Sequence, residues 1–332
     1  MTEELGAISA AIAAGESVRG TTSPNPPVGC ALVSASGELI ATGATSPAGG
    51  PHAEINALRQ AGARARGATA VVTLEPCNHT GRTGPCARAL VEAGVDRVVY
   101  FTADPNEAAA GGAVYLRNHG VEVDLQPVRV AALQPWLRSV RHGRPSVTLK
   151  FASTLDGFTA AADGTSQWIT GEAARGQVHE DRAKIDAIIV GTGTAIADDP
   201  SLTARFPDGT LRQHQPRRVV IGSREVPDGN LSRLGFEQHA TPREALDALW
   251  DTGARDVLVE GGATLAASFL ELDLVDAVQA YIAPALLGAG RGVLDRAIAG
   301  TIADAYRFRT TAVRHVGNDV FVEMERNVYG TH

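Results

Sequence analysis

The chain reads Pro-His-Ala-Glu at residues 51–54 and Glu-Pro-Cys-Asn-His-Thr-Gly-Arg-Thr-Gly-Pro-Cys at residues 75–86. The side chains with metal-binding and proton-transfer chemistry are His52, Glu54, Cys77 and Cys86. A histidine and two cysteines suit a zinc ion, and three protein ligands leave its fourth position open for water, as in catalytic zinc sites. The glutamate suits proton transfer beside that position. These two stretches predict a catalytic zinc site.

Length and composition limit the classes of protein that fit. A chain of 332 residues exceeds the usual size of one hydrophobic core and predicts two domains. The net charge of -7 argues against a broad nucleic-acid-binding surface, because such surfaces are normally basic. The first residues show neither the basic residues nor the apolar core expected of a signal peptide, and no apolar stretch approaches the length of a membrane span. We therefore expect a cytoplasmic protein with neither a membrane nor a nucleic-acid partner.

The three cysteines form no disulfide framework. Two of them belong to the predicted metal site, and Cys30 lies in the apolar run at residues 28–33. We expect Cys30 to be a small buried hydrophobic residue.

Hydrophobic periodicity predicts alternating helices and strands in the first half of the chain. The helices are expected at residues 4–19, 52–64, 86–93, 109–119 and 129–141, and the strands at 27–34, 38–44, 69–74, 95–101 and 120–125. This alternation favours an α/β sandwich. Residues two apart on a helix point to opposite sides, so His52 and Glu54 share a site only if His52 lies at the junction of loop and helix. Cys86 is expected near a helix N-terminus, where a thiolate is favoured.

A charged segment with glycine and proline at residues 141–145 predicts the domain boundary, giving domains at 1–144 and 145–332. The second domain is again expected to be α/β. Its strands are expected at residues 146–151, 186–190, 217–221, 256–260, 276–283 and 320–325, with helices at 242–252 and from Gly261-Gly262 to about 271.

The chemistry of the first site follows from its residue types. A histidine, a glutamate two residues later and a later pair of cysteines form the signature of zinc-dependent base deaminases. Zinc lowers the pKa of bound water to about 7, and the hydroxide attacks a ring carbon that bears an amino group. Glu54 passes a proton from the water to the ring nitrogen and the leaving amine. The non-catalytic alternatives are a buried cysteine pair beside a surface histidine, and a glutamate that merely caps a helix.

Further motifs lie in one order along nearly the whole chain, at residues 22–29, 104–106, 150, 154–157, 166–170, 197–203, 260–265 and 281–288. Together with the zinc motif, they resemble the bifunctional deaminase/reductase family of riboflavin biosynthesis. The resemblance implies an N-terminal cytidine-deaminase-like α/β/α sandwich and a C-terminal dihydrofolate-reductase-like α/β domain. It also implies zinc and NADPH as cofactors.

Eight residues separate Cys77 from Cys86, against two in the commoner deaminase motif. Taken alone, His79 and Arg82 within this insert fit either a solvated loop or contacts to a phosphorylated substrate. The resemblance implies that the phosphorylated pyrimidine is held by Asn25, His79, Arg82, Asp104 and Asn106. Thr45 stands where many members carry a histidine, a departure that concerns a substrate contact and not the zinc ligands.

The second half is less informative without the resemblance. A strand followed by two glycines and a helix, at residues 256–271, fits either a phosphate cradle or a tight turn. Trp168 fits a nicotinamide or the core, and its residue type favours the core. Arg182 and Arg205 are by residue type more often solvated than bound to a ligand.

The resemblance assigns roles to these residues. It implies cofactor contacts from Ser153, Trp168, Thr194, Asp198, Ser223, Gly262, Ala263, Thr264 and Leu265. It implies substrate contacts from Ser166, Arg182, Leu202, Arg205 and Glu260. Lys150 and Asp198 are the candidates for assisting ring opening and proton transfer. Gly222 precedes Ser223 where the family usually has an aspartate.

We therefore expect a bifunctional enzyme. Its first half removes the 2-amino group of 2,5-diamino-6-ribosylamino-4-pyrimidinone 5′-phosphate, and its second half reduces the ribosyl group to ribityl with NADPH. We also expect a homo-oligomer, a dimer or a tetramer. The alternatives are a zinc deaminase acting on another nucleoside or base with a non-catalytic second domain, and a zinc-stabilised binding protein without turnover.

Overall fold

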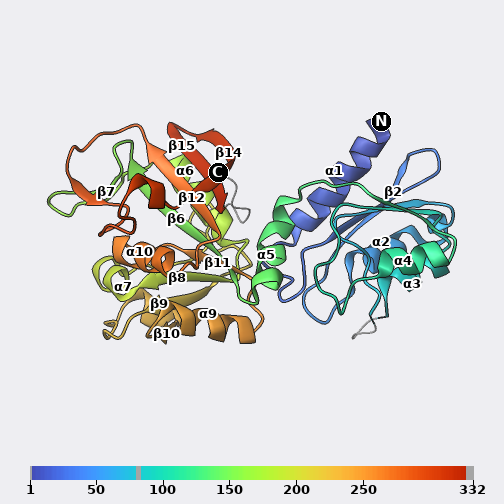
Figure 1. Cartoon of the computed structure of the whole chain (residues 1–332), viewed down its shortest axis with the longest axis horizontal. Helices are drawn as coiled ribbons and strands as arrows, with labels where there is room; N and C mark the ends of the chain where they lie inside the picture. The colour runs from blue at the N-terminus through green and yellow to red at the C-terminus, as the bar shows by residue number, and fades with distance from the viewer. Residues whose placement is uncertain (1, 80–83, 327–332) are drawn as a thin grey trace. The chain divides into compact units, whose positions relative to one another are not determined.

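The computed structural model describes residues 2–79 and 84–326, so the predicted substrate contact Arg82 lies outside the described residues. The chain divides into two compact units, Met1–Gly143 and Arg144–His332. Each unit has an α/β fold built on its own sheet (Figure 1).

A five-stranded sheet with the strand order β2-β1-β3-β4-β5 forms the centre of the first unit. Its strands are β1 (Gly29–Val33), β2 (Leu39–Ala44), β3 (Thr69–Val72), β4 (Arg97–Tyr100) and β5 (Glu122–Leu125). Strand β1 is antiparallel to both neighbours, whereas β3, β4 and β5 are parallel to one another.

Helices cover both faces of this sheet. They are α1 (Thr2–Ser17), α2 (Ala53–Ala61), α3 (Cys86–Glu92), α4 (Gly112–Asn118) and α5 (Gln134–His142), with short 3₁₀ turns at Gly62–Ala65 and Ala131–Leu133. The register pairs Gly43 with Cys30, so Gly43 and the adjacent Gly29 face opposite sides. A Cβ on Gly29 would lie 1.9 Å from a carbonyl oxygen of α1, and one on Gly43 would lie 2.2 Å from a carbonyl oxygen of α2. These two helices therefore pack closely on opposite faces, which makes the unit an α/β/α sandwich (Figure 1).

An eight-stranded sheet with the order β10-β9-β8-β11-β6-β12-β15-β14 forms the second unit. Its strands are β6 (Ser146–Thr154), β8 (Ala187–Gly191), β9 (Arg217–Ile221), β10 (Glu237–His239), β11 (Asp256–Val259), β12 (Ala277–Ala283), β14 (Phe308–Val316) and β15 (Asp319–Arg326). The strands from β10 to β12 run parallel, and β15 and β14 continue the sheet antiparallel. The central strands are buried on both faces, which explains their continuous apolar runs.

The helices of the second unit are α6 (Glu172–Arg182), α7 (Thr192–Asp198), α8 (Asn230–Leu234), α9 (Pro242–Asp251) and α10 (Ala263–Glu271). A small second sheet pairs β7 (Phe158–Ala161) with β13 (Gly290–Gly292), and a 3₁₀ turn lies at Ile302–Asp304. Helices α7 and α10 follow directly after β8 and β11, so both begin at the carboxyl edge of the parallel strands. In open α/β sheets, ligands bind at this edge.

The predicted element bounds agree with the structure to within a few residues for the apolar strands, and the 217–221 strand has the predicted bounds. The elements of the second unit that were not predicted are helices α6, α7 and α8 and strands β7, β10, β13 and β14. Helix α6 buries only Ala174 fully, and β14 has no fully buried residue, so neither produces an apolar period in the sequence. Within residues 2–79 and 84–326, no helix has both the length and the hydropathy that a membrane crossing requires.

Candidate active sites

The three predicted zinc ligands lie together in the first unit. Nδ1 of His52 is 3.6 Å from Sγ of Cys77 and 3.4 Å from Sγ of Cys86. All three donor atoms lie within 4.8 Å of one another. A tetrahedral zinc, with bonds of about 2.3 Å to sulfur and about 2.0–2.1 Å to nitrogen, places the two donors about 3.6 Å apart. The donor set and its spacing therefore fit a single zinc ion.

Two helix starts position these ligands. His52 is the N-cap residue of α2 with extended backbone angles, φ -75 and ψ 168, which confirms the predicted junction of loop and helix. Cys86 is the first residue of α3, also as predicted, and its backbone N–H donates to Sγ of Cys77 at 3.4 Å. Because each ligand is fixed by backbone geometry, the site is organised by the fold itself.

The two sulfurs influence each other's ionisation. Hydrogen bonds with the Cys86 thiol and with His52 lower the pKa of Cys77 well below its ordinary value. The negative sulfur of Cys77 and burial then raise the pKa of Cys86, and the hydrogen bond to Cys77 raises the pKa of His52. The first proton therefore leaves easily and the second is retained until a cation replaces it, as expected for a thiolate metal site.

Glu54 lies in the first turn of α2 and is only 4% exposed. Burial is the main cause that raises its pKa to about 7, and the negative Cys77 adds to the effect. The N-cap residue of α2 is His52 and not Glu54. Cys30, by contrast, is fully buried in the apolar core, as predicted, and burial raises the pKa of its thiol.

Four of the residues predicted to contact the pyrimidine phosphate lie on three loops of the first unit: Asn25, His79, Asp104 and Asn106. Asn25 is half-buried in the proline-rich loop, which is held by a hydrogen bond of 3.0 Å from Nε1 of Trp136 to the Pro24 carbonyl oxygen. Nδ1 of His79 is buried and has no hydrogen-bond partner among the residues that the structure describes. Such an orphaned polar atom fits a group that meets a ligand.

Asp104 and Asn106 form a tight loop after β4. Oδ1 of Asp104 accepts the backbone N–H of Asn106 at 2.8 Å, and burial raises the pKa of the Asp104 carboxyl. Thr45, where the family usually has histidine, is buried and turned to the backbone of Val28, whose N–H donates to its hydroxyl at 3.2 Å. The Thr45 hydroxyl therefore already accepts a hydrogen bond from within the first unit.

In the second unit, Lys150, Arg182 and Glu260 form a buried ion cluster. Nε and Nη2 of Arg182 donate to the two carboxylate oxygens of Glu260 at 2.8 and 2.7 Å, and Nζ of Lys150 lies 3.7 Å from the same carboxylate. Burial opposes ionisation of Glu260, but the two cations outweigh it and lower its pKa to about 2. The side chain of Arg182 is 15% exposed, so its interpretation as a solvated arginine is wrong.

Strand register explains this cluster. Leu149 of β6 pairs with Val259 of β11, so the next residues, Lys150 and Glu260, lie side by side at the carboxyl edge. Arg182 reaches them from the last residue of α6. The remaining predicted catalytic residue, Asp198, is exposed at the end of α7.

Several predicted cofactor residues gather at the same edge. The backbone N–H of Gly262, the N-cap residue of α10, donates to Oγ1 of Thr194 on α7 at 3.2 Å. Ala263 and Leu265 are buried in the first turn of α10, and Ser153 is buried on β6. These contacts bring together the starts of the two helices, as a cradle for a cofactor requires.

Ser223 is exposed just after β9. The residue before it, Gly222, has a φ of 125, and a Cβ there would lie 2.7 Å from Oγ1 of Thr192. The aspartate that the family usually carries here does not fit this backbone. The side chain of Arg224 reaches the same threonine, with Nε 3.3 Å from its hydroxyl.

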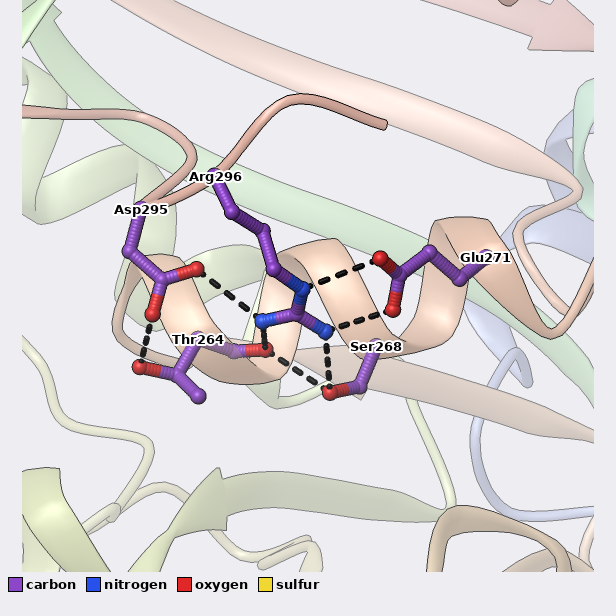
Figure 2. A network of polar contacts seen from close by, with 5 residues as sticks. All are labelled: Thr264, Ser268, Glu271, Asp295 and Arg296. Carbon is purple, nitrogen blue, oxygen red and sulfur yellow. Dashed lines mark hydrogen bonds and ion pairs between the residues drawn. The ribbon is translucent and has the colours of Figure 1, made fainter. Parts of the chain in front are cut away.

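Thr264, also predicted to contact the cofactor, belongs to a polar network on α10. Figure 2 shows the guanidinium of Arg296 lying along the helix between Glu271 and Asp295. Nε of Arg296 donates to Glu271 at 2.9 Å, and the Thr264 hydroxyl donates to Asp295 at 2.5 Å. The network holds the segment at residues 295–296 against α10. Within it, the Thr264 hydroxyl already has a hydrogen-bond partner, Asp295.

The residue-type interpretation of Trp168 as a core residue is wrong. Its side chain is 69% exposed, and the Arg175 guanidinium lies 4.6 Å from the ring centroid. Ser166 is exposed nearby. Leu202 is 3% exposed, and Nε of Arg205 donates to the Thr203 hydroxyl at 2.8 Å. An exposed indole ring is free to meet a ligand, as the resemblance implies.

Two family models match this chain, one in each of the two units that hold the candidate sites. Residues 1–102 match the family model described as the cytidine and deoxycytidylate deaminase zinc-binding region. Residues 145–322 match the RibD C-terminal domain. The riboflavin biosynthesis protein RibD of Corynebacterium ammoniagenes is 60% identical over 307 residues, which cover 90% of this chain and 91% of that protein. The chain belongs to the RibD family.

Other RibD proteins extend the likeness. RibD of Escherichia coli is 39% identical over 351 residues, covering 92% of this chain and 95% of that protein. Among solved structures, a diaminohydroxyphosphoribosylaminopyrimidine deaminase/5-amino-6-(5-phosphoribosylamino)uracil reductase from Thermotoga maritima superposes with a TM-score of 0.87 at 32% identity, covering 98% of this chain and 99% of that one. Acinetobacter baumannii RibD gives a TM-score of 0.84 at 38% identity with the same coverage of both chains.

RibD membership confirms the family resemblance and the predicted fold class. The chain is a bifunctional enzyme of riboflavin biosynthesis that joins a zinc-binding deaminase domain to a reductase domain.

Sequence analysis did not identify Tyr281 and Asp181 beside the ion cluster of the reductase domain. The Tyr281 hydroxyl donates to Oδ2 of Asp181 at 2.9 Å, and Nζ of Lys150 lies 5.8 Å from the ring centroid. Burial and the Asp181 carboxylate raise the pKa of Tyr281. A signal was present, since Tyr281 opens the RibD motif at residues 281–288.

Proposed function

We propose that this chain catalyses two successive reactions. Residues 1–144 hydrolytically deaminate 2,5-diamino-6-ribosylamino-4-pyrimidinone 5′-phosphate, and residues 145–332 reduce the ribosyl group of the product to ribityl with NADPH. The observation that carries the proposal is the placement of the buried Glu54 carboxyl two residues from a histidine that shares one zinc-sized site with two cysteines. RibD membership supplies the substrate class.

In the deaminase half, His52, Cys77 and Cys86 hold the zinc ion. Zinc, when bound, acidifies water and so provides a nucleophile at neutral pH. The Glu54 carboxylate accepts one proton from the attacking water and delivers it to the ring nitrogen, and it then accepts the second proton from the newly added hydroxyl and delivers it to the leaving amine. Ammonia departs and a ring carbonyl remains. Because Glu54 is buried, its carboxylate exchanges protons with the reactants rather than with bulk water.

Substrate recognition is assigned to Asn25, His79, Arg82, Asp104 and Asn106. The orphaned Nδ1 of His79 supports this assignment, because a hydrogen bond to substrate would satisfy a polar atom that the described residues leave unpaired. Arg82 is assigned to the phosphate because a guanidinium binds phosphate through paired hydrogen bonds.

In the reductase half, NADPH supplies a hydride. The ribosylamine ring opens to an imine, whose carbon accepts the hydride while its nitrogen accepts a proton. We assign assistance of these proton transfers to Lys150 and Asp198. Lys150 is half-buried beside Glu260 and Arg182, so its ammonium is held in one place. Substrate contacts are assigned to Ser166, Arg182, Leu202, Arg205 and Glu260.

The cofactor contacts are assigned to the carboxyl edge of the sheet. The residues are Ser153, Trp168, Thr194, Asp198, Ser223 and the run Gly262, Ala263, Thr264 and Leu265. The hydrogen bond between Gly262 and Thr194 and the exposure of Trp168 support this assignment. We further propose that the enzyme acts in the cytoplasm without a nucleic-acid partner. We also propose that it is a dimer or a tetramer, and light scattering of the purified chain tests this oligomeric state.

A coupled assay tests the two reactions. The purified chain, loaded with zinc, is given the pyrimidine phosphate and NADPH, and ammonia and NADPH are followed separately. We expect ammonia release first and NADPH oxidation after it. Lys150→Ala is expected to stop NADPH oxidation while leaving ammonia release intact. Ammonia release without any NADPH oxidation by the unaltered chain would mean that the second domain is not catalytic, and activity on cytidine in place of the pyrimidine phosphate would contradict the substrate assignment.

A further inference from the structure

Glu75 is a buried carboxylate that neither the zinc site nor the assigned substrate contacts use. It follows β3 and lies two residues before the zinc ligand Cys77. Its side chain is 9% exposed. Oε1 accepts the backbone N–H groups of Gly111 at 3.2 Å and Ala113 at 3.0 Å, and Oε2 accepts that of Asp104 at 3.4 Å.

These three N–H groups belong to the two ends of one loop. The loop connects β4 to α4 and carries Asp104 and Asn106, two of the assigned substrate contacts. At its far end, the N-cap position of α4 is Gly111, which has no side chain to accept the first N–H groups of the helix. Glu75 accepts them from another part of the chain, so one carboxylate closes the loop at both ends.

The loop also meets the cysteine segment through its backbone. The N–H of Asn78 donates to the carbonyl oxygen of Ala109 at 2.9 Å. A Cβ on Gly112 would lie 1.7 Å from the carbonyl oxygen of Pro76, so the first turn of α4 touches the residue between Glu75 and Cys77. Three successive residues thus hold the loop, contact α4 and supply a zinc ligand.

We propose that Glu75 is a positioning residue of the deaminase site, which fixes the loop carrying Asp104 and Asn106 relative to the zinc ligand Cys77. The inference rests on the proposed function in one respect, namely that this loop contacts the substrate. A carboxylate suits the task because all three partners are donors and both its oxygens accept. A glutamine side chain has one oxygen, so at least one of these N–H groups would face an amide nitrogen.

Glu75→Gln tests the proposal, with Glu92→Gln as the matched control. Glu92 lies on α3 in the same domain, and its side chain is 61% exposed in an ion pair with Arg88. Zinc per chain, KM and kcat for ammonia release, and amide hydrogen exchange over residues 104–113 are measured for both variants. Glu75→Gln is expected to keep zinc and to raise KM about tenfold with a small change in kcat, because it weakens binding and transition-state contacts alike. Exchange over residues 104–113 is expected to accelerate, and Glu92→Gln is expected to match the unaltered chain.

Two results would overturn the proposal. One is a folded Glu75→Gln protein with the KM and exchange of the control. The other is loss of zinc without faster exchange in the loop, which would assign Glu75 to the metal ligands. If Glu75→Gln does not fold, Glu75→Asp takes its place, since it keeps the charge, shortens the reach by one methylene and is expected to raise KM and exchange less strongly. A chain that releases no ammonia from the pyrimidine phosphate would refute the proposed function, and the exchange measurement would still decide whether Glu75 holds the loop.

Discussion

Replacing Arg182 with alanine is expected to destabilise the reductase domain far more than replacing Arg217. The two arginines make ion pairs of nearly the same geometry, with Nε and Nη2 at 2.8 and 2.7 Å from Glu260 in one case and at 2.8 and 2.8 Å from Glu237 in the other. The Arg182 and Glu260 side chains are 15% and 9% exposed, against 34% and 39% for Arg217 and Glu237. The two pairs therefore differ mainly in burial, and Lys150 lies beside the buried pair.

The magnitude follows from Glu260. Burial disfavours its charge, but Arg182 and Lys150 lower its pKa from 4.5 to about 2. The difference of about 2.5 corresponds to ~3 kcal/mol of stabilisation of the charged form in the folded state. Arg182→Ala removes the bidentate partner of this buried carboxylate and leaves Lys150, 3.7 Å away, beside it. A loss of about 3–5 kcal/mol in the free energy of unfolding is expected. Arg217→Ala is expected to lose less than about 1 kcal/mol, as for exposed pairs.

The pH dependence has a defined sign. Because the pKa of Glu260 is lower in the folded chain than its ordinary value, the stabilisation is fully present above about pH 4.5 and is lost as the pH falls towards 2. The difference in unfolding free energy between the unaltered chain and Arg182→Ala is therefore expected to be large at pH 7 and to narrow as the pH falls.

Urea unfolding followed by tryptophan fluorescence measures these differences. A Trp136→Phe background restricts the signal to Trp168 and Trp250 of the reductase domain. Equal losses for Arg182→Ala and Arg217→Ala would refute the argument from burial. A difference that does not narrow as the pH falls from 7 towards 2 would refute the assignment of the stabilisation to the Glu260 charge.

Three further predictions concern the two sites. Gly43→Ala is expected to lower zinc content after dialysis, because a Cβ there would lie 2.2 Å from a carbonyl oxygen of α2 and displace the helix whose N-cap residue is the zinc ligand His52. Gly6→Ala, where a Cβ meets nothing within 4 Å, is the control that should keep zinc. Trp168→Ala is expected to raise KM for NADPH while changing the unfolding free energy by less than about 1 kcal/mol, since Trp168 is 69% exposed. A large loss of stability in urea unfolding would contradict the surface position of this side chain. Removal of zinc by a chelator is expected to abolish ammonia release but to leave NADPH oxidation with the deaminated substrate unchanged. The reason is that the zinc donors all belong to Met1–Gly143. Parallel loss of both activities would contradict this independence of the two domains.

The positions of two zinc ligands were predictable because local sequence fixes them. His52 precedes a helix and Cys86 begins one, and the local patterns predicted both positions. The ion cluster of Lys150, Arg182 and Glu260 was not predictable as a cluster, although the resemblance assigned a role to each residue. Its geometry depends on β6 lying beside β11, a neighbour relation that no local pattern encodes.

The secondary structure shows the same difference between features that the local sequence encodes and features that it does not. Buried strands such as β9 were predicted from apolar runs, whereas the edge strand β14 is largely exposed along its length and gives no such run. Helix α7 contains Gly193, and glycine lowers helix propensity by about 1 kcal/mol, so the sequence favours a glycine-rich loop over the observed helix. The sequence assigned no role to Glu75, because its three partners are backbone groups, which leave no signature in residue types.

Ammonia release by Glu54→Gln tests the central claim most directly. The variant keeps the size of the side chain and leaves His52, Cys77 and Cys86 unchanged. We expect it to bind one zinc per chain and to reduce the deaminated substrate with NADPH at the rate of the unaltered chain. Its rate of ammonia release is expected to fall by about 10²–10⁴-fold, the range of a lost general acid–base group. Ammonia release at the unaltered rate, with zinc bound, would contradict the account of a zinc-dependent deaminase in which Glu54 transfers the proton.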